Sequence, residues 1–519
     1  MRPEAWRPPV ELTADEQGVV GLSKQRSRFF VFLRGCRHEL LDDGFQAELA
    51  AMYAAAGRGQ PPVPPAQLAL ATLLQAYTGA SDEEAVEAAV ADRRWQLVLG
   101  CVGAARAPFG KGTLWRFRGL LVRSEMDRRL VERTVELAER RGGFGPRALR
   151  AALDASPLRG AGRVEDTYNL LGHALRKALG VLARQQGRGL ADVAAEAGAP
   201  ELAASSLKAA LDADWDDPAA RTAALGRVLE LVAAVAAYAA DRPAAPAAAD
   251  AVAVAERVRA QDVAVDAAGT PALGRGVARD RRISVEDAEM RHGRKSRSER
   301  VDGYKRHVLR DLDGGLVRAV AVTAANEPEA TATPALEADL DRQGCTIAEL
   351  HVDRGYLASH LVRDRPPDRA VVAKAWPLRN AGRFTKEAFV FDWDAGTLRC
   401  PAGRVRPFAP GTTVRFPASA CAACPLRSGC TASAHGRAVA VHPDERLLAD
   451  LRARQRTPEG RAALRERAAV EHDLAHVGRW QGDRARYRGA RKNLLDLRRT
   501  AAVHNLVVIA RRYPTPIAA

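Results

Sequence analysis

The chain has 519 residues and a formal net charge of +16, with a sequence pI of about 10.0. Its hydrophobic content of 47% can support a large core divided among several domains, and the excess of Lys and Arg indicates a polyanionic partner such as nucleic acid. Residues 1–20 contain no apolar signal core, and the most apolar run, Leu231 to Ala240, is too short to span a bilayer. We therefore expect a cytoplasmic, nucleoid-associated protein without a membrane anchor.

The first quarter of the chain predicts helices. Residues 1–21 are expected to form a tail, residues 22–125 a helical DNA-binding domain, and residues 126–145 a linker helix. Within the domain, a helix beginning near Thr113 interleaves Arg116 and Arg118 with aromatic side chains. This composition suits docking on DNA, although an ordinary helical bundle with a solvated arginine face would have the same pattern.

Two later segments each predict a strand that ends in a carboxylate. The first is Leu149 to Asp154, followed by a Ser-Pro turn, and the second is Leu350 to Asp353, followed by Gly355. A carboxylate at the end of a strand, beside a glycine that lets the backbone turn sharply, can reach a metal ion in a crevice. Many such aspartates instead cap the next helix.

The order of predicted elements favours a mixed sheet flanked by helices, in a domain made of residues 146–385 and 435–519. Residues 160–270 are Ala-rich and predict a helical insertion, and they show no recognisable chemistry. After the insertion, a basic turn carries Arg291, Arg294 and Lys295, and Lys305 lies on the strand that follows. In such a sheet, Asp154 and Asp353 could lie at the ends of neighbouring strands.

Four of the seven cysteines fall in residues 390–432, namely Cys400, Cys421, Cys424 and Cys430. Thiolates with C-x-x-C spacing can bind one tetrahedral Zn²⁺, and such a closed site would be structural. Because the first cysteine stands alone, a loop of free thiols is the alternative.

The C-terminal region predicts a helix over residues 460–480, in which Glu471 lies one turn after Arg467 on the same face. Arg486, Tyr487 and Arg488 follow, and these side chains could contact phosphates. A simple surface ion pair between Arg467 and Glu471 is the alternative interpretation.

Four motifs, taken in order, resemble those of bacterial insertion-sequence transposases of the DDE class, which have an RNase H-like catalytic core. The helices before residue 125 and the Cys-rich segment also resemble parts of this family, the latter an insertion found in one branch, so the resemblance covers nearly the whole chain. The motifs are Leu153–Pro157, Arg291–Ser296 with Asp302–Lys305, His351–Tyr356, and Arg467–Glu471 with Arg486–Gly489.

The resemblance implies an α/β fold in which Asp154, Asp353 and Glu471 are the catalytic carboxylates. Oxygen ligands suit two Mg²⁺ (or Mn²⁺) ions, because hard divalent ions prefer oxygen. It further implies cleavage of double-stranded DNA at the element ends, joining of a 3′-OH to target DNA, a homodimer on DNA, and a phosphate contact by Arg467. Three other carboxylates could be ligands instead: Asp166, Asp302 and Glu466. Glu466 points off the Arg467–Glu471 face, and Asp302 fits a turn.

Two positions depart from the family pattern. Leu464 replaces a tyrosine, and Gly478 stands where a lysine is expected, with Arg479 next to it. These departures leave the three carboxylates in place but favour, to some extent, a catalytically silent DNA-binding relative such as a repressor or a domesticated factor. A third alternative is an RNase H-like nuclease that cuts DNA without joining it.

Overall fold

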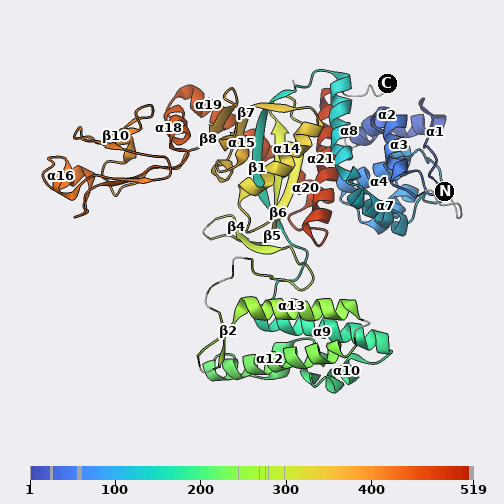
Figure 1. Ribbon diagram of the computed structural model, residues 1–519. Helices are drawn as coiled ribbons and strands as arrows, with labels where there is room; N and C mark the ends of the chain where they lie inside the picture. The colour runs from blue at the N-terminus through green and yellow to red at the C-terminus, as the bar shows by residue number, and fades with distance from the viewer. Residues whose placement is uncertain are drawn as a thin grey trace.

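A six-stranded mixed sheet lies at the centre of the chain in the computed structural model (Figure 1). Its strands are β1 (Ala148–Arg159), β4 (Arg291–Arg294), β5 (Arg300–Asp311), β6 (Val317–Ala324), β7 (Thr346–Val352) and β8 (Ala370–Ala373). The structure describes residues 2–23, 27–54, 61–145, 147–242, 245–267, 269–274, 276, 278, 280–296 and 298–513.

Strand β1 is central in this sheet. It pairs antiparallel with β5 on one side and parallel with β7 on the other, and β8 continues parallel to β7. Strands β4 and β6 share the far edge of β5. The strand order and the helices on both faces confirm the expected α/β, RNase H-like class.

Strand β1 does not end at Asp154, as the sequence predicted, but continues to Arg159. The reason is that β5 is long enough to pair with every residue up to Arg159. Pro157 is tolerated because its missing N–H points away from β5: the N–H of Arg159, two residues on, also points that way and donates to Asp483 O at 2.9 Å.

Helices cover both faces of the sheet. Helix α14 (Thr333–Arg342) and helix α18 (Glu445–Arg454) pack on the face that carries Leu149, Ala151 and Leu153. Helix α20 (Ala468–Gln481) and helix α21 (Ala490–Arg512) lie on the opposite face. The single helix predicted over residues 460–480 is instead two helices, α19 (Pro458–Glu466) and α20, which are separated at Arg467.

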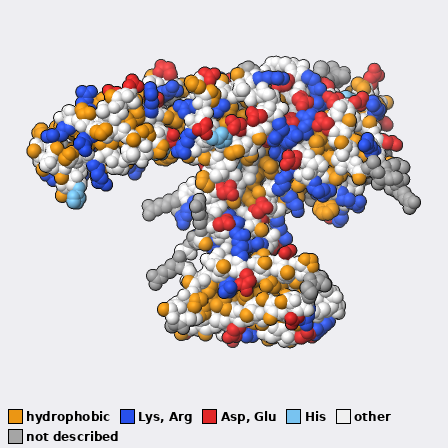
Figure 2. All heavy atoms as spheres, viewed as in Figure 1, with side chains coloured by type: hydrophobic (Ala, Val, Ile, Leu, Met, Phe, Trp, Pro, Cys, Tyr) orange, Lys and Arg blue, Asp and Glu red, His pale blue; other side chains and the backbone are white. Residues whose placement is uncertain are grey.

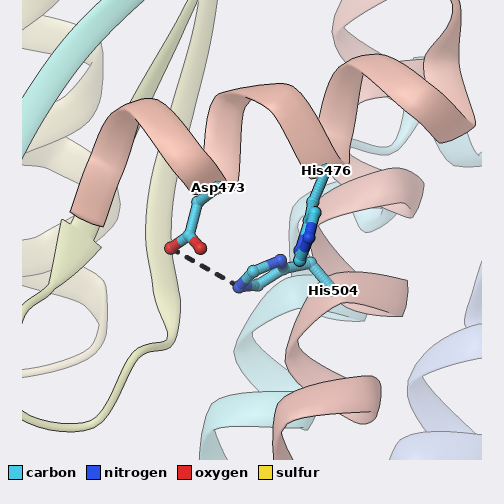
Figure 3. Close-up of side chains that lie close together, drawn as sticks. All are labelled: Asp473, His476 and His504. Carbon is cyan, nitrogen blue, oxygen red and sulfur yellow. Dashed lines mark ion pairs between the residues drawn. The ribbon is translucent and has the colours of Figure 1, made fainter. Parts of the chain in front are cut away.

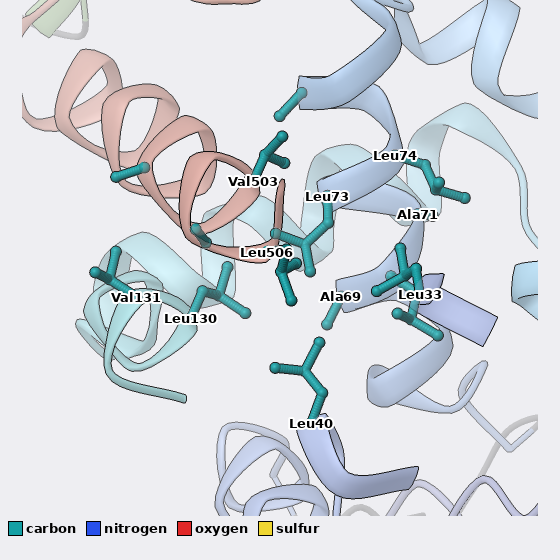
Figure 4. Close-up of a cluster of buried hydrophobic side chains, with 14 of the residues drawn as sticks. Leu33, Leu40, Ala69, Ala71, Leu73, Leu74, Leu130, Val131, Val503 and Leu506 are labelled. Atoms are coloured by element: carbon teal, nitrogen blue, oxygen red, sulfur yellow. The ribbon is translucent and has the colours of Figure 1, made fainter. Parts of the chain in front are cut away.

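The N-terminal helices share one hydrophobic core with α21, as Val503 and Leu506 lie among side chains from residues 33 to 131 (Figure 4). Two predictions are therefore wrong. Helix α8 packs against α21 and is no simple linker, and residues 1–21 form no tail, because α1 buries Glu16 against Arg34. The helices are α1 (Ala14–Gly21), α2 (Arg28–Leu40), α3 (Asp43–Ala51), α4 (Pro65–Thr78), α5 (Asp82–Ala91), α6 (Arg93–Leu99), α7 (Lys111–Arg123) and α8 (Met126–Arg141).

The helical insertion extends away from the sheet and has its own core (Figure 1). One of its helices, α12, is long and apolar enough to cross a membrane, by length and composition only. The apolar segment is therefore longer than the run from Leu231 to Ala240 that the sequence suggested. Its buried side chains pack against α9 and α13 within the bundle. The elements are α9 (Thr167–Gln186), α10 (Leu190–Glu196), η2 (Pro200–Ala203), α11 (Leu207–Leu211), α12 (Pro218–Ala240), α13 (Pro246–Asp262), β2 (Val263–Val265) and β3 (Pro271–Leu273).

The Cys-rich segment forms a second small extension with a core around Phe389, Leu398 and Phe416 (Figure 1). Its last strand lies beyond residue 432, the end that the sequence predicted. The elements are η5 (Lys386–Ala388), β9 (Val390–Asp392), β10 (Thr397–Arg399), β11 (Val405–Pro407), β12 (Thr413–Arg415), α16 (Ala418–Ala422), α17 (Arg427–Cys430) and β13 (Ala438–Ala440).

Candidate active site

The register of the sheet places Asp154 and Asp353 side by side. Strands β1 and β7 run parallel with Leu153 opposite Val352. Asp154 is the next residue of β1, and Asp353 directly follows the end of β7. Both Leu153 and Val352 point into the core beneath the sheet, so the aspartates that follow them point to the opposite face. Helix α20 lies on that face.

Glu471 reaches the same place from α20. It lines one cavity of about 290 Å³ together with Asp154 and Asp353. Arg467 connects the helix to the sheet: its Nη1 lies 2.9 Å from Asp154 Oδ2, and its Nη2 lies 2.9 Å from Glu471 Oε1. The structure thus brings together the three carboxylates and the arginine that the sequence singled out from three distant segments.

The environment of Asp154 disfavours its charge. Burial raises the pKa of its carboxyl to about 6, although a backbone hydrogen bond from Ala155 and the charge of Arg467 oppose the shift. The nearby carboxylates of Asp353 and Glu471 raise the pKa further. A cation placed among the three groups would relieve this repulsion.

Asp353 does not cap the helix that follows it. The short helix η4 (Arg354–Tyr356) begins next to it, but the Asp353 side chain makes no capping hydrogen bond. Among the described residues, no hydrogen bond or ion pair to this carboxylate is formed, and the side chain faces the cavity. Its oxygens are therefore available to a ligand.

The three rival carboxylates have other partners. Asp166 caps α9 by accepting a hydrogen bond from Asn169 N, and Asp302 accepts from His292 Nδ1 at 2.5 Å. Glu466 pairs with Arg150. Because none of the three lines the cavity, we do not count them among the candidate ligands.

The cavity contains positive charge as well as negative charge. Arg294, Lys295 and Lys305 line it, as the sequence suggested for residues that contact DNA. Lys305 Nζ donates to Glu327 O at 2.9 Å and lies 3.8 Å from Glu329 Oε1. Lys and Arg side chains also gather on the narrow connection between the sheet and the helical insertion (Figure 2).

Two arginines expected to contact DNA are buried, and the structure does not support that role for them. Arg118 forms an ion pair with Asp82, and Arg291 forms one with Asp280 and also donates to backbone carbonyls. Arg116, two residues before Arg118, is exposed beside Trp115, whose exposed fraction is 70%. The phase of helix α7 therefore turns only one of the two predicted arginines outward.

The last two arginines predicted to contact DNA, Arg486 and Arg488, lie just before the start of α21. Arg486 donates to Gly79 O at 2.8 Å, and this bond connects the segment before α21 to the N-terminal helices. Arg488 pairs with Glu286, and its side chain remains 55% exposed. Of the two, Arg488 has more surface left for a phosphate.

Sequence reasoning missed Glu329, which lines the cavity with the three carboxylates. It opens the short helix η3 (Glu329–Ala332), just after β6. The same rule that selected Asp154 and Asp353, an acid after a predicted strand, could have identified it. The sequence also did not predict why residue 355 is a glycine. Its φ is not positive, so the backbone does not require glycine, but a Cβ on Gly355 would clash with Glu329 Oε2.

The residue at the second departure from the family pattern borders a buried arginine. A Cβ on Gly478 would lie 3.1 Å from Arg306 Nη2, so a larger side chain would compete with this guanidinium. Arg306 donates to Ser156 Oγ at 2.7 Å and to Gly482 O at 3.0 Å. A positive charge from β5 thus occupies the space beside the position where the family has lysine.

The carboxylate cavity fits a divalent cation by the chemistry of its donors. Carboxylate oxygens are the ligands that Mg²⁺ and Mn²⁺ prefer, and burial and the neighbouring carboxylates raise the pKa of Asp154, an effect that a bound cation would oppose. The ligand atoms of Asp154, Asp353 and Glu471 do not all lie within 4.8 Å of one another. The three carboxylates are therefore spaced more widely than the ligands of one closed coordination shell. Waters on the ion and DNA oxygens could complete the coordination.

A second cluster of potential metal ligands lies between α20 and α21 (Figure 3). The ligand atoms of Asp473, His476 and His504 lie within 4.8 Å of one another, the only such group in the described ranges. However, Asp473 Oδ2 lies 3.0 Å from Arg310 Nη1, and burial lowers the pKa of His504 to about 4. This cluster offers one carboxylate, which is paired with Arg310, and two imidazoles, whereas the cavity offers three carboxylates, so the cavity suits a hard divalent cation better.

The four clustered cysteines line a small cavity in the Cys-rich extension. Burial raises the pKa of Cys430, and the other three cysteines raise it further. Tetrahedral Zn²⁺ with thiolate ligands would bring the sulfurs to about 3.8 Å from one another. The four sulfurs converge on one space but do not form a group within 4.8 Å.

An RNase H-like sheet with carboxylates on adjacent strands is typical of nucleases and transposases. Three family models match the chain: the Transposase domain (DUF772) over residues 32–120, and two models described as Transposase DDE domain over residues 259–371 and 406–510. No curated protein and no solved structure matches it. The chain belongs to the bacterial insertion-sequence DDE transposases. The matched ranges include Asp353 and Glu471, whereas Asp154 lies outside them.

Members of this family act on DNA and use divalent metal ions. The matches therefore account for the strongly basic composition of the chain.

Proposed function

We propose that the protein cleaves the ends of its insertion element and joins the 3′-OH to target DNA by metal-dependent phosphoryl transfer. The observation that carries the proposal is the register of β1 and β7, which sets Asp154 beside Asp353 on the face where α20 presents Glu471. These three carboxylates would hold two Mg²⁺ or Mn²⁺ ions. When bound, such ions activate the attacking hydroxyl and stabilise the leaving oxygen.

The residues around the carboxylates would position the DNA. Arg294, Lys295 and Lys305 lie where a phosphate backbone entering the cavity would pass, and backbone contacts fix the register of a bound duplex. Arg467, which now bridges Asp154 and Glu471, has further donors for a phosphate. We infer that it exchanges part of its contact with the carboxylates for the DNA strand.

The remaining components of the proposal lie outside the cavity. Exposed Arg116 and Arg488 would add phosphate contacts, and a homodimer would hold two element ends together, as the family suggests. The four cysteines would take a structural Zn²⁺ once their sulfurs approach one another.

Cleavage and joining assays with the element's own end DNA in Mg²⁺ test the proposal. Asp353→Asn keeps the shape of the side chain but removes the charge, and the matched control is Asp341→Asn, at an exposed position of α14. We expect cleaved and joined products from the wild type and the control and none from Asp353→Asn. Cleavage without joining would indicate a nuclease, and DNA binding without cleavage in any variant would indicate a silent DNA-binding relative.

A further inference from the structure

Glu329 shares the catalytic cavity with the three carboxylates of the family motif, although it comes from a different part of the chain. Its only ion pair among the described residues is with Lys305, at 3.8 Å from Nζ to Oε1. Its side chain is 26% exposed, compared with 56% for Glu471. Glu329 is therefore less solvated than Glu471, and a distant lysine compensates it only in part.

The backbone after Asp353 is shaped around Glu329. The carboxylate lies so close to Gly355 that a Cβ there would be 2.0 Å from Oε2, and φ at Gly355 does not itself require glycine. Glycine at this position thus lets a side chain from η3 reach the turn that carries Asp353. A carboxylate held against that turn is held close to Asp353.

The next residue gives independent information on the geometry. Tyr356 is buried, and its hydroxyl lies 2.7 Å from His307 Nδ1. Burial raises the pKa of this hydroxyl well above its usual range, and Glu329, Asp154 and Asp353 each raise it further. The effect on this phenol agrees with the cavity that Asp154, Asp353 and Glu329 line together, which places Glu329 in the same cluster of negative charge.

We propose that Glu329 is a fourth acidic residue of the divalent-ion site, binding an ion directly or through one of the ion's water molecules. This rests on the proposed function, because the other three carboxylates supply the site. Gly355 acts as a positioning residue, since it leaves the space in which Glu329 approaches Asp353. More carboxylates on one ion raise its affinity, and Mg²⁺ bound by few of them retains several waters.

Binding of Mn²⁺ to the full chain without DNA tests the inference, with the affinity and number of ions measured by electron paramagnetic resonance. Glu329→Gln keeps the volume of the side chain, and Glu327→Gln, two residues earlier and outside the cavity lining, is the matched control. We expect Glu329→Gln to weaken Mn²⁺ binding by about tenfold or more, with the control unchanged. Gly355→Ala should reproduce the loss, because its methyl group displaces the carboxylate.

The outcomes separate the two proposals. Wild-type affinity in Glu329→Gln, with binding lost in Asp353→Asn, would overturn the role of Glu329 and leave the proposed function intact. Unchanged binding in both Asp353→Asn and Asp154→Asn would refute the metal site itself. Thermal unfolding in EDTA shows whether Glu329→Gln is folded. A folded variant with normal Mn²⁺ affinity counts against the inference.

Discussion

Replacing Arg467 by Gln should destabilise the carboxylate cavity mainly when no metal ion is present. In the structure, Arg467 forms ion pairs at 2.9 Å with Asp154, whose side chain is 16% exposed, and with Glu471, which is 56% exposed. The exposed pair contributes only a few tenths of a kcal/mol, whereas losing a charged partner from a largely buried carboxylate costs about 2 kcal/mol. We expect a total loss of about 2 kcal/mol in EDTA.

Saturating Mg²⁺ should remove most of this difference. An ion neutralises the same two carboxylates, and in the wild type it must compete with the guanidinium that already does so. Ligand binding stabilises the folded state according to ligand concentration and affinity, so Arg467→Gln should gain more from Mg²⁺ than the wild type does. Hydrogen exchange of amides in β1 and α20, measured with and without Mg²⁺, reports the local free energy of opening.

Arg465→Gln is the matched control for this experiment. Arg465 is exposed on α19, two residues from Arg467, and forms no ion pair among the described residues. It should leave exchange unchanged in both conditions. Equal protection in Arg467→Gln and the wild type in EDTA, or the same loss with and without Mg²⁺, would refute the idea that Arg467 and the ion share the carboxylates.

Three further predictions follow from the pKa of Asp154, from two glycines and from the arginines of α7. Because the pKa of Asp154 is raised from 3.8 to about 6, the folded state retains a proton that the unfolded chain has lost. In EDTA, stability should therefore fall, and Mn²⁺ affinity should rise, as the pH rises through this range; titrations of Asp154→Asn should lack both effects. Gly303→Ala should lower the free energy of unfolding by more than about 3 kcal/mol or prevent folding, because φ is +149° and a Cβ would clash with Gly160 N. Gly226→Ala is the control: it lies in open space on α12, so it should raise the melting temperature slightly. Arg116→Ala should weaken binding to end DNA and reduce the slope of its salt dependence by about one, while the melting temperature stays unchanged. Arg118→Ala should lower the melting temperature, because it breaks the ion pair with Asp82. Equal effects of the two variants on the melting temperature would contradict the assigned orientations.

The fold class and the places of Asp154 and Asp353 could be predicted because both aspartates follow apolar runs that read as strands. Asp353 follows such a run, and its position beside Asp154 needs only a parallel pair of strands. The length of β1 could not be predicted in the same way. Pro157 reads as a turn residue, and only the partner strand β5 shows that its missing N–H is harmless.

The rest of the site could not be predicted, because it depends on how side chains are oriented on their helices and on packing between distant segments. The alternation of arginines with aromatic residues in α7 does not say which side chain the neighbouring helix buries, and the structure buries Arg118. Glu329 depends on contact with Gly355, from a segment beyond the next helix and strand. A sequence indicates that a glycine is present but not which side chain approaches it.

The helical insertion also bears on how the central sheet forms. The chain enters the insertion at the end of β1 and returns to the sheet through β4, which precedes β5. The two ends of the insertion lie together, because Gly160 N donates to Asp302 O at 2.8 Å and Glu165 N donates to Ile283 O at 3.2 Å. If the long connection were unstructured, joining β1 to β5 would carry the entropy cost of closing it, although that cost grows by only about 0.6 kcal/mol per doubling of length. The insertion has its own hydrophobic core, so it can fold first and bring its two ends together. The strand that carries Asp154 would then pair with β5 at a lower entropy cost than an unstructured connection of the same length would impose.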